Sequence, residues 1–350
     1  MAGAASEGLP ELRGGQSRAR GGRRAAGPGR APLENEVRIL AGDVGGTTTR
    51  LAVCVLERGR PRPVHTTVVP SEPSGDLAAL LRVFAERNGP FDVACIGVPG
   101  PVEGDVVRTT NLPWRLDARA LARAAGVARL RLVNDLVAHA RGLDELDDDA
   151  LATLHDGEPD TDAPRVIVAP GTGLGVAWSV RVAGRPLALA SEAGHLGFAP
   201  AEPEEYDLAR ALAARYGRAS WERVVSGPGL AAIDRMLAAG ESTGERSPEE
   251  ISRAALERRD ERAERALGLF ARALARFAGD LGLALRARGG VFVGGGIAPA
   301  ILPRLRAPDV LAAFTAKGRL TELACRLPLR VVLDERAGLL GAARLAVEGA

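Results

Sequence analysis

The sequence predicts an α/β protein made of two halves. Short apolar runs alternate with longer helical patterns over most of its 350 residues, and this length suits two domains. Each half also opens on the same unit, an apolar run, a glycine turn and a second run rich in β-branched residues, at 37–56 and again at 166–182. A repeated unit of this kind is more specific than a simple alternation of strands and helices.

The chain begins with a segment that we expect to be disordered. Residues 1–36 are mostly Gly, Ala, Pro and Arg, so they cannot bury enough apolar surface to offset the entropy of ordering. No apolar run follows Arg23 and Arg24, which argues against an export signal. The six arginines of this segment lack interleaved aromatic residues, so nucleic-acid binding is not predicted.

The first half is expected to be ordered from Val37 onward. Its predicted elements are strands at 37–41, 49–56, 64–69, 93–98 and 130–133, a helix at 77–86, a turn at 99–104, and a helix that begins at Asp135.

The second half repeats the pattern with more helix. Its predicted elements are strands at 166–169, 176–182, 289–293 and 329–333, helices at 207–216 and 228–239, one long helical stretch over 248–288, and a terminal helix from Gly338.

Composition excludes several classes of protein. A net charge of +2 argues against general attraction to nucleic acid or to anionic membranes. No run approaches the roughly 18 apolar residues that a membrane span needs. Cys54, Cys95 and Cys325 all lie in apolar surroundings, so we expect buried thiols in a reducing, cytoplasmic compartment.

Lys317 is the only lysine in a chain that otherwise uses arginine. Two interpretations stay open. The residue is either a chance survivor on the surface or a compact charge in a confined site, closing a helix end or bracing two domains. In the second case Phe314, one helical turn earlier, would be its buried anchor.

Three glycine turns are candidates for nucleotide binding, because main-chain N–H groups can converge on phosphate oxygens where no Cβ interferes. The first contains a carboxylate and a hydroxyl that suit a magnesium nucleotide, the second offers a similar cradle, and the third suits a flat group such as adenosine. Their residues are Gly42, Asp43, Val44, Gly45, Gly46 and Thr47; Gly171, Thr172 and Gly173; and Gly294, Gly295 and Gly296.

Two other nucleotide-binding patterns do not fit. A dinucleotide fold requires the first glycine turn to open a helix, whereas residues 49–56 predict a strand. The GxxxxGK[ST] pattern of a phosphate-binding loop is absent from the sequence.

Polar residues that could perform chemistry follow the strands. Asn134 and Asp135 come after a buried run, where a carboxylate can cap a helix and also act in a site. Glu192 and His195 lie three residues apart among small residues, so both can reach one ligand. They make a poor metal site, because no other His or Cys cluster is available. Glu222, taken alone, reads as a solvated helix charge.

Together these segments resemble the bacterial glucokinase family, from residue 37 to the C-terminus. The matching segments are GDVGGT at 42–47, Thr110 and Asn111 with Trp114, Asn134 with Asp135, GTGLGVA at 171–177, EAGH at 192–195, Glu222 with SGPGL at 226–230, GGGI at 294–297, KGR at 317–319 and GLLG at 338–341.

The resemblance implies a two-domain sugar kinase/Hsp70/actin-like (ribonuclease H-like) fold with an interdomain cleft. It implies an ATP-dependent glucose kinase with Asp135 as the general base. Asn111, Asn134, Glu192, His195 and Glu222 would join Asp135 in binding the sugar. The turns at 42–47 and 171–173 would bind phosphates, and Asp43 would hold Mg²⁺ through water.

The resemblance further implies a small domain of 37–145 with 336–350, a large domain of 146–335, and a homodimer; the disordered extension at 1–36 is not a shared feature of the family. Ser191 and Ala193 depart from glycines of some family members, and the missing cysteine-rich motif implies no structural zinc. Three alternatives remain. One is a kinase of fructose, mannose or an N-acetyl hexosamine, and one is a non-catalytic sugar-binding regulator. The third is a DNA-binding repressor, for which residues 1–36 provide no winged helix.

Overall fold

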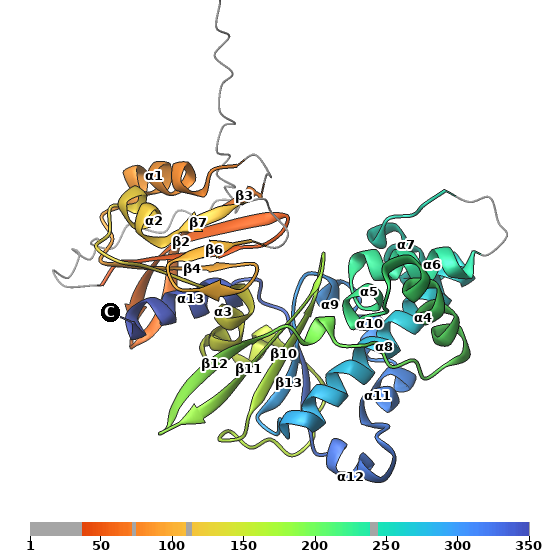
Figure 1. The fold of residues 1–350 in the computed structure, drawn as a ribbon. Helices are drawn as coiled ribbons and strands as arrows, with labels where there is room; N and C mark the ends of the chain where they lie inside the picture. Colours follow the sequence, from red (N-terminus) through yellow and green to blue (C-terminus); the bar gives the residue numbers. More distant parts are fainter. Residues whose placement is uncertain (1–36, 72–74, 110–113, 239–243, 350) are drawn as a thin grey trace, which may run out of the picture.

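The computed structural model describes residues 37–71, 75–109, 114–238 and 244–349. The predictions for the extension at 1–36 and for Asn111 lie outside these ranges. Two sheets, each with its own layer of helices, form the molecule (Figure 1).

The first sheet has the strand order β3-β2-β1-β4-β8. β1 pairs antiparallel with β2, whereas β1–β4 and β4–β8 are parallel. Its strands are β1 (Ile39–Val44), β2 (Thr48–Glu57), β3 (Arg60–Pro70), β4 (Val93–Val98) and β8 (Leu130–Asn134). A small sheet accompanies it, formed by β5 (Val102–Glu103), β6 (Val106–Arg108) and β7 (Arg115–Asp117).

Both faces of the first sheet are covered. Leu40, Leu51 and Ile96 are buried with residues of α1 (Leu77–Asn88) and α2 (Ala118–Ala125). Ile39 and Ala41, whose side chains alternate with these along β1, are instead buried with the C-terminal helix α13 (Ala337–Glu348). The last helix of the chain therefore packs on the sheet that begins it.

The second sheet has the order β12-β11-β10-β13-β14-β9. Its strands are β9 (Leu151–His155), β10 (Arg165–Pro170), β11 (Leu174–Val182), β12 (Arg185–Ser191), β13 (Gly290–Val293) and β14 (Leu329–Val332). The helices of this half are α4 (Pro203–Tyr216), α5 (Trp221–Val224), α6 (Gly227–Leu237), α7 (Pro248–Leu256), α8 (Glu261–Leu285), α9 (Ile297–Ala300), α10 (Leu302–Leu305), α11 (Pro308–Thr315) and α12 (Thr321–Ala324).

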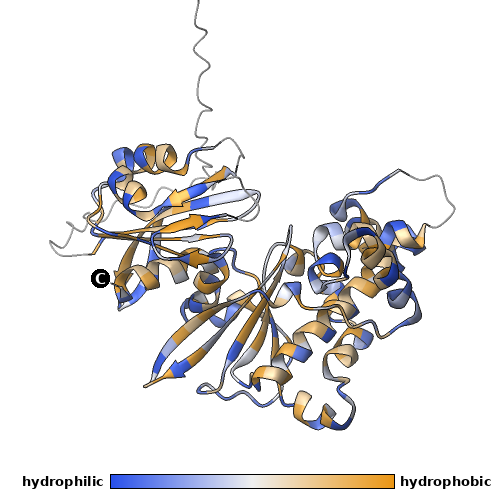
Figure 2. Ribbon diagram, viewed as in Figure 1, coloured by the Kyte–Doolittle hydropathy of each residue, from blue (hydrophilic) through white to orange (hydrophobic). Residues whose placement is uncertain are grey.

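The largest core of the molecule lies between the second sheet and α8, whose Phe270 and Phe277 are buried. Figure 2 shows hydrophobic residues along the strands and along α8. No helix within the described ranges is long and apolar enough to cross a membrane.

A pair of helices joins the two sheets. α3 (Asp135–Gly142) contacts α13 on one side and β10, β11 and β12 on the other. A short 3-10 turn, η1 (Leu143–Glu145), follows α3 directly. The residues just before α3 are therefore held at the junction of the two halves.

Most predicted elements are confirmed, with two corrections. The helical stretch over 248–288 is two helices: α7 ends at Leu256, Arg258 has a φ of 53°, and the Asp260 side chain caps α8 by accepting from the Ala263 N–H. The prediction that all three thiols are buried is wrong for Cys325, which is exposed; all three cysteines are free.

Candidate active site

The first glycine turn links β1 to β2 at the edge of the first sheet. The N–H of Gly45 donates to the Thr48 carbonyl at 2.9 Å and closes the turn. The N–H groups of Gly46 and Thr47 have no acceptor among the described residues, so they are available to a ligand. Asp43 sits inside β1 with 5% of its surface exposed. The turn thus presents N–H donors beside a buried carboxylate, which suits a phosphate with a cation.

Asp135 begins α3 at the end of β8. Asn134 caps the helix, because its Oδ1 accepts from the N–H groups of Leu136 and Val137 at 3.1 and 3.2 Å. Its Nδ2 donates to the Gly100 carbonyl at 3.1 Å. Asn134 is therefore the N-cap of α3, and Asp135 is the first residue of the helix, so its side chain is not used as the cap.

The charge of Asp135 is destabilised by its surroundings. Burial raises the pKa of the Asp135 carboxyl to about 7, against the opposing influence of His139 and with the help of the nearby Asp43 carboxylate. A carboxyl with a pKa near neutrality is suited to exchange a proton during a reaction.

His139, one turn along α3, was not predicted as a site residue. Its Nδ1 lies 3.0 Å from the main-chain oxygen of Asp135, and its Nε2 lies 4.0 Å from Oδ2 of Asp43. The sequence signal was its spacing of four residues from Asp135, which places both on one face of the helix.

The second glycine turn links β10 to β11 and is tied to Glu222. The N–H of Leu174 donates to Oε2 of Glu222 at 3.1 Å, and a Cβ on Gly173 would lie 2.7 Å from the same oxygen. The N–H groups of Thr172 and Gly173 have no acceptor within the described ranges. Glu222 is half-buried on α5, so it is more than a solvated helix charge.

The acid–histidine segment meets Glu222 from the other side. Nδ1 of His195 lies 3.8 Å from Oε1 of Glu222, and Nε2 lies 3.8 Å from Oε2 of Glu192. All the side chains of this cluster reach solvent, with His195 and Glu192 the most exposed. Two carboxylates and an imidazole can therefore offer hydrogen bonds to one polyhydroxylated ligand.

The third glycine turn follows β13 next to the second. Gly294 donates its N–H to the Val168 carbonyl at 2.8 Å, and Gly295 adopts a φ of +73°, where an added Cβ would lie 2.6 Å from the Pro170 carbonyl oxygen. Gly295 and Gly296 are exposed, and neither has an N–H acceptor among the described residues. The bare backbone leaves room for a flat group.

A line of contacts joins these parts. Asp43 is near His139, which is bonded to the main chain of Asp135, and Leu136 packs on Gly175, where a Cβ would lie 2.5 Å from its Cδ2. Gly175 belongs to β11, directly after the turn that Glu222 contacts.

Two of the residues predicted for the first turn are buried in the sheet beside it. Gly42 packs against Ile96, and the Val44 side chain is fully buried, so both support the turn.

No group of three or more His, Cys, Asp or Glu residues that could hold a metal ion occurs in the part of the chain that the structure describes. A cation at Asp43 would thus need ligands from a bound molecule or water.

Comparisons with known proteins give a consistent result. A sequence model of the glucokinase family matches residues 40–348. The glucokinase of Caulobacter sp. (strain K31) is 36% identical over 309 residues, which cover 87% of this chain and 93% of the relative.

Solved structures agree. Glucokinase from an Antarctic psychrotroph is 30% identical with a TM-score of 0.77, covering 89% of this chain and 99% of that one. A ROK family glucokinase from Streptomyces griseus, in complex with glucose and AMPPNP, is 21% identical with a TM-score of 0.65. It covers 89% of this chain and 100% of that one, and it supports the two-domain sugar kinase fold.

Proposed function

The chain belongs to the glucokinase family, and from this premise we propose that it transfers the terminal phosphoryl group of ATP to the 6-hydroxyl of glucose. The observation that carries the proposal is the line of contacts from Asp43 through Asp135 to Glu222. It connects a turn suited to phosphate with a cluster suited to a sugar, and Asp135 lies between them.

Asp135 is the proposed general base. As the 6-hydroxyl attacks the phosphorus, its proton passes to the Asp135 carboxylate, which must be ionised to accept it. A base with a pKa of about 7 is well matched to this task near neutral pH. General-base catalysis of this kind typically contributes about 10²–10⁴-fold.

Asn134, Glu192, His195 and Glu222 are the proposed ligands of the other sugar hydroxyls, with Asn111, which lies outside the described residues. Carboxylates that lose their hydroxyl partner are left unpaired, so such a site rejects sugars that lack a hydroxyl. The contacts of Glu222 with the Leu174 N–H and with His195 support a fixed position for this group.

ATP would lie across the glycine turns. The free N–H groups of Gly46, Thr47, Thr172 and Gly173 fit its phosphates, and Gly294, Gly295 and Gly296 fit its adenosine. Asp43 fits a magnesium ion held through water, because it is a buried carboxylate and the ring nitrogen Nε2 of His139 comes no closer to it than 4.0 Å. When bound, Mg²⁺ supplies charge neutralisation for the phosphates.

The proposed small domain comprises 37–145 and 336–350, and the large domain 146–335. The packing of α13 on the first sheet supports this discontinuous division. Closure of the two on the sugar would exclude water, which otherwise competes as the acceptor.

We also propose a cytoplasmic homodimer. The exposed Val182, Leu187 and Leu189 on the β11–β12 hairpin offer apolar surface for a contact between copies. Sedimentation of the purified chain tests the dimer directly.

A coupled assay of the purified protein tests the function. ATP, ADP and polyphosphate are compared as donors, and glucose, fructose, mannose and N-acetyl hexosamines as acceptors. Glucose with ATP is expected to give the highest kcat/KM. A clear preference for another hexose would favour the alternative kinase, and no turnover with glucose binding retained would favour a non-catalytic regulator.

Asp135→Asn tests the base. The amide keeps the shape of the side chain but cannot accept the proton, so turnover is expected to fall by at least about 10²-fold. Calorimetry on the same preparation should show nearly unchanged glucose affinity. Turnover within tenfold of wild type would show that Asp135 is not the base.

A further inference from the structure

The second glycine turn and the sugar cluster meet at Leu174, the first residue of β11. The N–H of Leu174 donates to Oε2 of Glu222 at 3.1 Å. Its carbonyl oxygen lies against the segment between Glu192 and His195, because a Cβ on Gly194 would lie 2.1 Å from it. The main chain that leaves the turn is therefore held by both segments that carry the proposed sugar ligands.

The turn is anchored a second time, at its start. The carbonyl of Gly171 accepts from the N–H of Gly227 at 2.8 Å, and Gly227 is the first residue of α6. Ser226 links this helix to α5, because its Oγ donates to the Glu222 carbonyl at 2.6 Å. The short segment from α5 to α6 thus holds both ends of the turn.

The carboxylate of Glu222 lies directly on the turn. A Cβ on Gly173 would lie 2.7 Å from Oε2 of Glu222, closer than a side-chain carbon can approach an oxygen. The contact therefore depends on the missing side chain of this glycine. The Glu222 side chain is still 28% exposed, so a ligand can reach it while it is bonded to the turn.

We propose that Glu222 is a positioning residue of the phosphate turn, through which glucose and nucleotide strengthen each other's binding. The proposal rests on the proposed function. A sugar hydroxyl that donates to the Glu222 carboxylate holds this side chain in place, and the same carboxylate holds the Leu174 N–H. The turn is then already ordered when the phosphates arrive, so the nucleotide binds more tightly. Coupling between two ligands is reciprocal, so each should raise the other's affinity by the same factor.

Calorimetry on the intact chain measures the coupling. Glucose is titrated with and without a saturating non-hydrolysable ATP analogue and Mg²⁺, and the analogue is titrated with and without glucose. We expect each ligand to tighten the binding of the other by at least about fivefold, the lower end of typical couplings between sites.

Two alanine variants of the turn test the contact with Glu222. Gly173→Ala places a methyl group against Oε2, so it should weaken glucose binding by at least about fivefold with no nucleotide present. Gly171→Ala is the matched control, because no heavy atom of the described residues would lie within 4 Å of its Cβ and neither glycine has a left-handed φ. The affinity of this control for glucose should equal that of the wild type.

Two substitutions of Glu222 test the hydrogen bond itself, with the analogue and Mg²⁺ but no sugar. Glu222→Gln keeps an oxygen that can accept from the Leu174 N–H, whereas Glu222→Ala does not. Both variants lose the negative charge, so the difference between them reports the bond alone. The alanine variant should bind the analogue at least about fivefold more weakly than the glutamine variant.

Three outcomes would overturn the positioning role of Glu222. They are equal glucose affinity in the two turn variants, equal analogue affinity in the two Glu222 variants, and independent binding of the two ligands to the wild type. If Gly173→Ala does not fold, the comparison of the Glu222 variants decides. A wild-type protein that does not bind glucose would contradict the proposed function instead, and the analogue affinities of the Glu222 variants would still test the positioning of the turn.

Discussion

Asp135 performs its proposed chemistry from a position where its charge is costly. Burial raises the pKa of its carboxyl from 3.8 to about 7. A raised pKa in the folded state means that protonation favours folding, so this contribution is complete below the unfolded value and is lost as the pH rises through about 7. Ionised Asp135 therefore lowers the stability of the folded protein at neutral pH, and the same burial gives the carboxylate a pKa that suits a base near neutrality.

The pH dependence follows from the same shift. Only the ionised carboxylate accepts a proton, so kcat/KM for glucose is expected to rise with pH and to level off above about 7. Initial rates at limiting glucose across the pH range give the profile. An acidic limb centred near the ordinary aspartate value would contradict the assignment of Asp135 as the titrating base.

Lys317 occupies a confined site and not an exposed position on the surface. Its side chain is 7% exposed, and its Nζ donates to Oδ1 of Asp280 at 2.7 Å and to the Arg276 carbonyl at 3.0 Å. Gly279 makes the space, because a Cβ there would lie 2.8 Å from Cε of the lysine. Phe314 is fully buried, as expected of the anchor. The lysine ties the segment that follows α11 to the C-terminal half of α8 and does not join the two sheets.

Lys317→Arg is expected to destabilise the protein, because a planar guanidinium is wider than an ammonium and the slot over Gly279 is closed. Overfilling of this kind typically costs about 1–3 kcal/mol. Thermal unfolding measures the loss, and both Michaelis constants should stay unchanged. Arg319→Lys, an exposed exchange two residues away, is the control. Equal melting temperatures for both variants would restore the chance interpretation.

At the scale of elements, the crossing of α3 and α13 depends on glycine. A Cβ on Gly341 would overlap the Ala138 carbonyl, and one on Gly142 would overlap the Ala337 carbonyl. The helices thus approach backbone to backbone, directly behind the residues of the proposed site. The short separation between the two helices is possible because Gly142 and Gly341 have no side chains.

Gly341→Ala should therefore destabilise the protein although alanine favours helix by about 1 kcal/mol. The clash is with main chain and cannot be relieved by a rotamer change, so we expect a net loss of about 1–3 kcal/mol. Gly268→Ala in α8 is the control, because its Cβ would meet only the ends of two arginine side chains at 3.3 Å. Urea unfolding of both variants gives the comparison, and a loss equal to that of the control would refute the close crossing.

Local sequence predicted most elements, because strands beside a glycine turn have dense β-branched runs. It failed where the signal was short. The break between α7 and α8 consists of a few charged residues, and only Asp260 as a helix cap marks it. β12 (Arg185–Ser191) was missed: it lies at a sheet edge with Leu187 and Leu189 exposed, and Pro186 near its start weakens the strand signal.

At the scale of the whole molecule, the sequence located the site motifs but could not pair them. The contacts of Asp43 with His139 and of Glu222 with Leu174 join residues 96 and 48 positions apart. Such pairings depend on the sheet order and on the placement of α3 between the halves. The hydrophobic periodicity of the sequence carries no information on the order of the strands or on the placement of α3.

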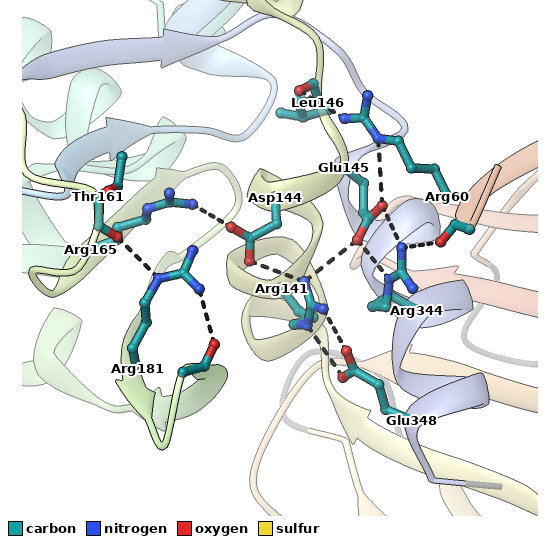
Figure 3. Close-up of polar contacts among 12 residues, drawn as sticks. Arg60, Arg141, Asp144, Glu145, Leu146, Thr161, Arg165, Arg181, Arg344 and Glu348 are labelled. Atoms are coloured by element: carbon teal, nitrogen blue, oxygen red, sulfur yellow. Dashed lines mark hydrogen bonds and ion pairs between the residues drawn. The ribbon is translucent and has the colours of Figure 1, made fainter.

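Charged side chains surround the end of α3, where the two halves meet (Figure 3). Glu145, 9% exposed, accepts from Arg344 at 2.7 Å and lies 3.5 Å from Arg141, which also pairs with Glu348 of α13 at 2.5 Å. These pairs tie η1 to the first half.

One of the pairs around the end of α3 reaches a strand of the second sheet. Oδ1 of Asp144 lies 2.6 Å from Nη1 of Arg165, the first residue of β10, and both side chains are about four-fifths covered. Because α3 reaches the second sheet mainly through apolar contacts, this ion pair provides a directional link between the halves.

A double-mutant cycle on Asp144→Asn and Arg165→Gln should measure that link. Partly buried pairs in one network couple by about 0.5–3 kcal/mol, and we expect a value of at least about 1 kcal/mol, obtained from urea unfolding with unchanged m-values. The matched control is Asp207 with Arg210, an exposed pair on α4 whose side chains are 60% and 78% accessible. Solvent screens such pairs, so its coupling should stay below about 0.5 kcal/mol. Equal coupling in the two cycles would mean that the Asp144–Arg165 ion pair does not hold α3 on the second sheet.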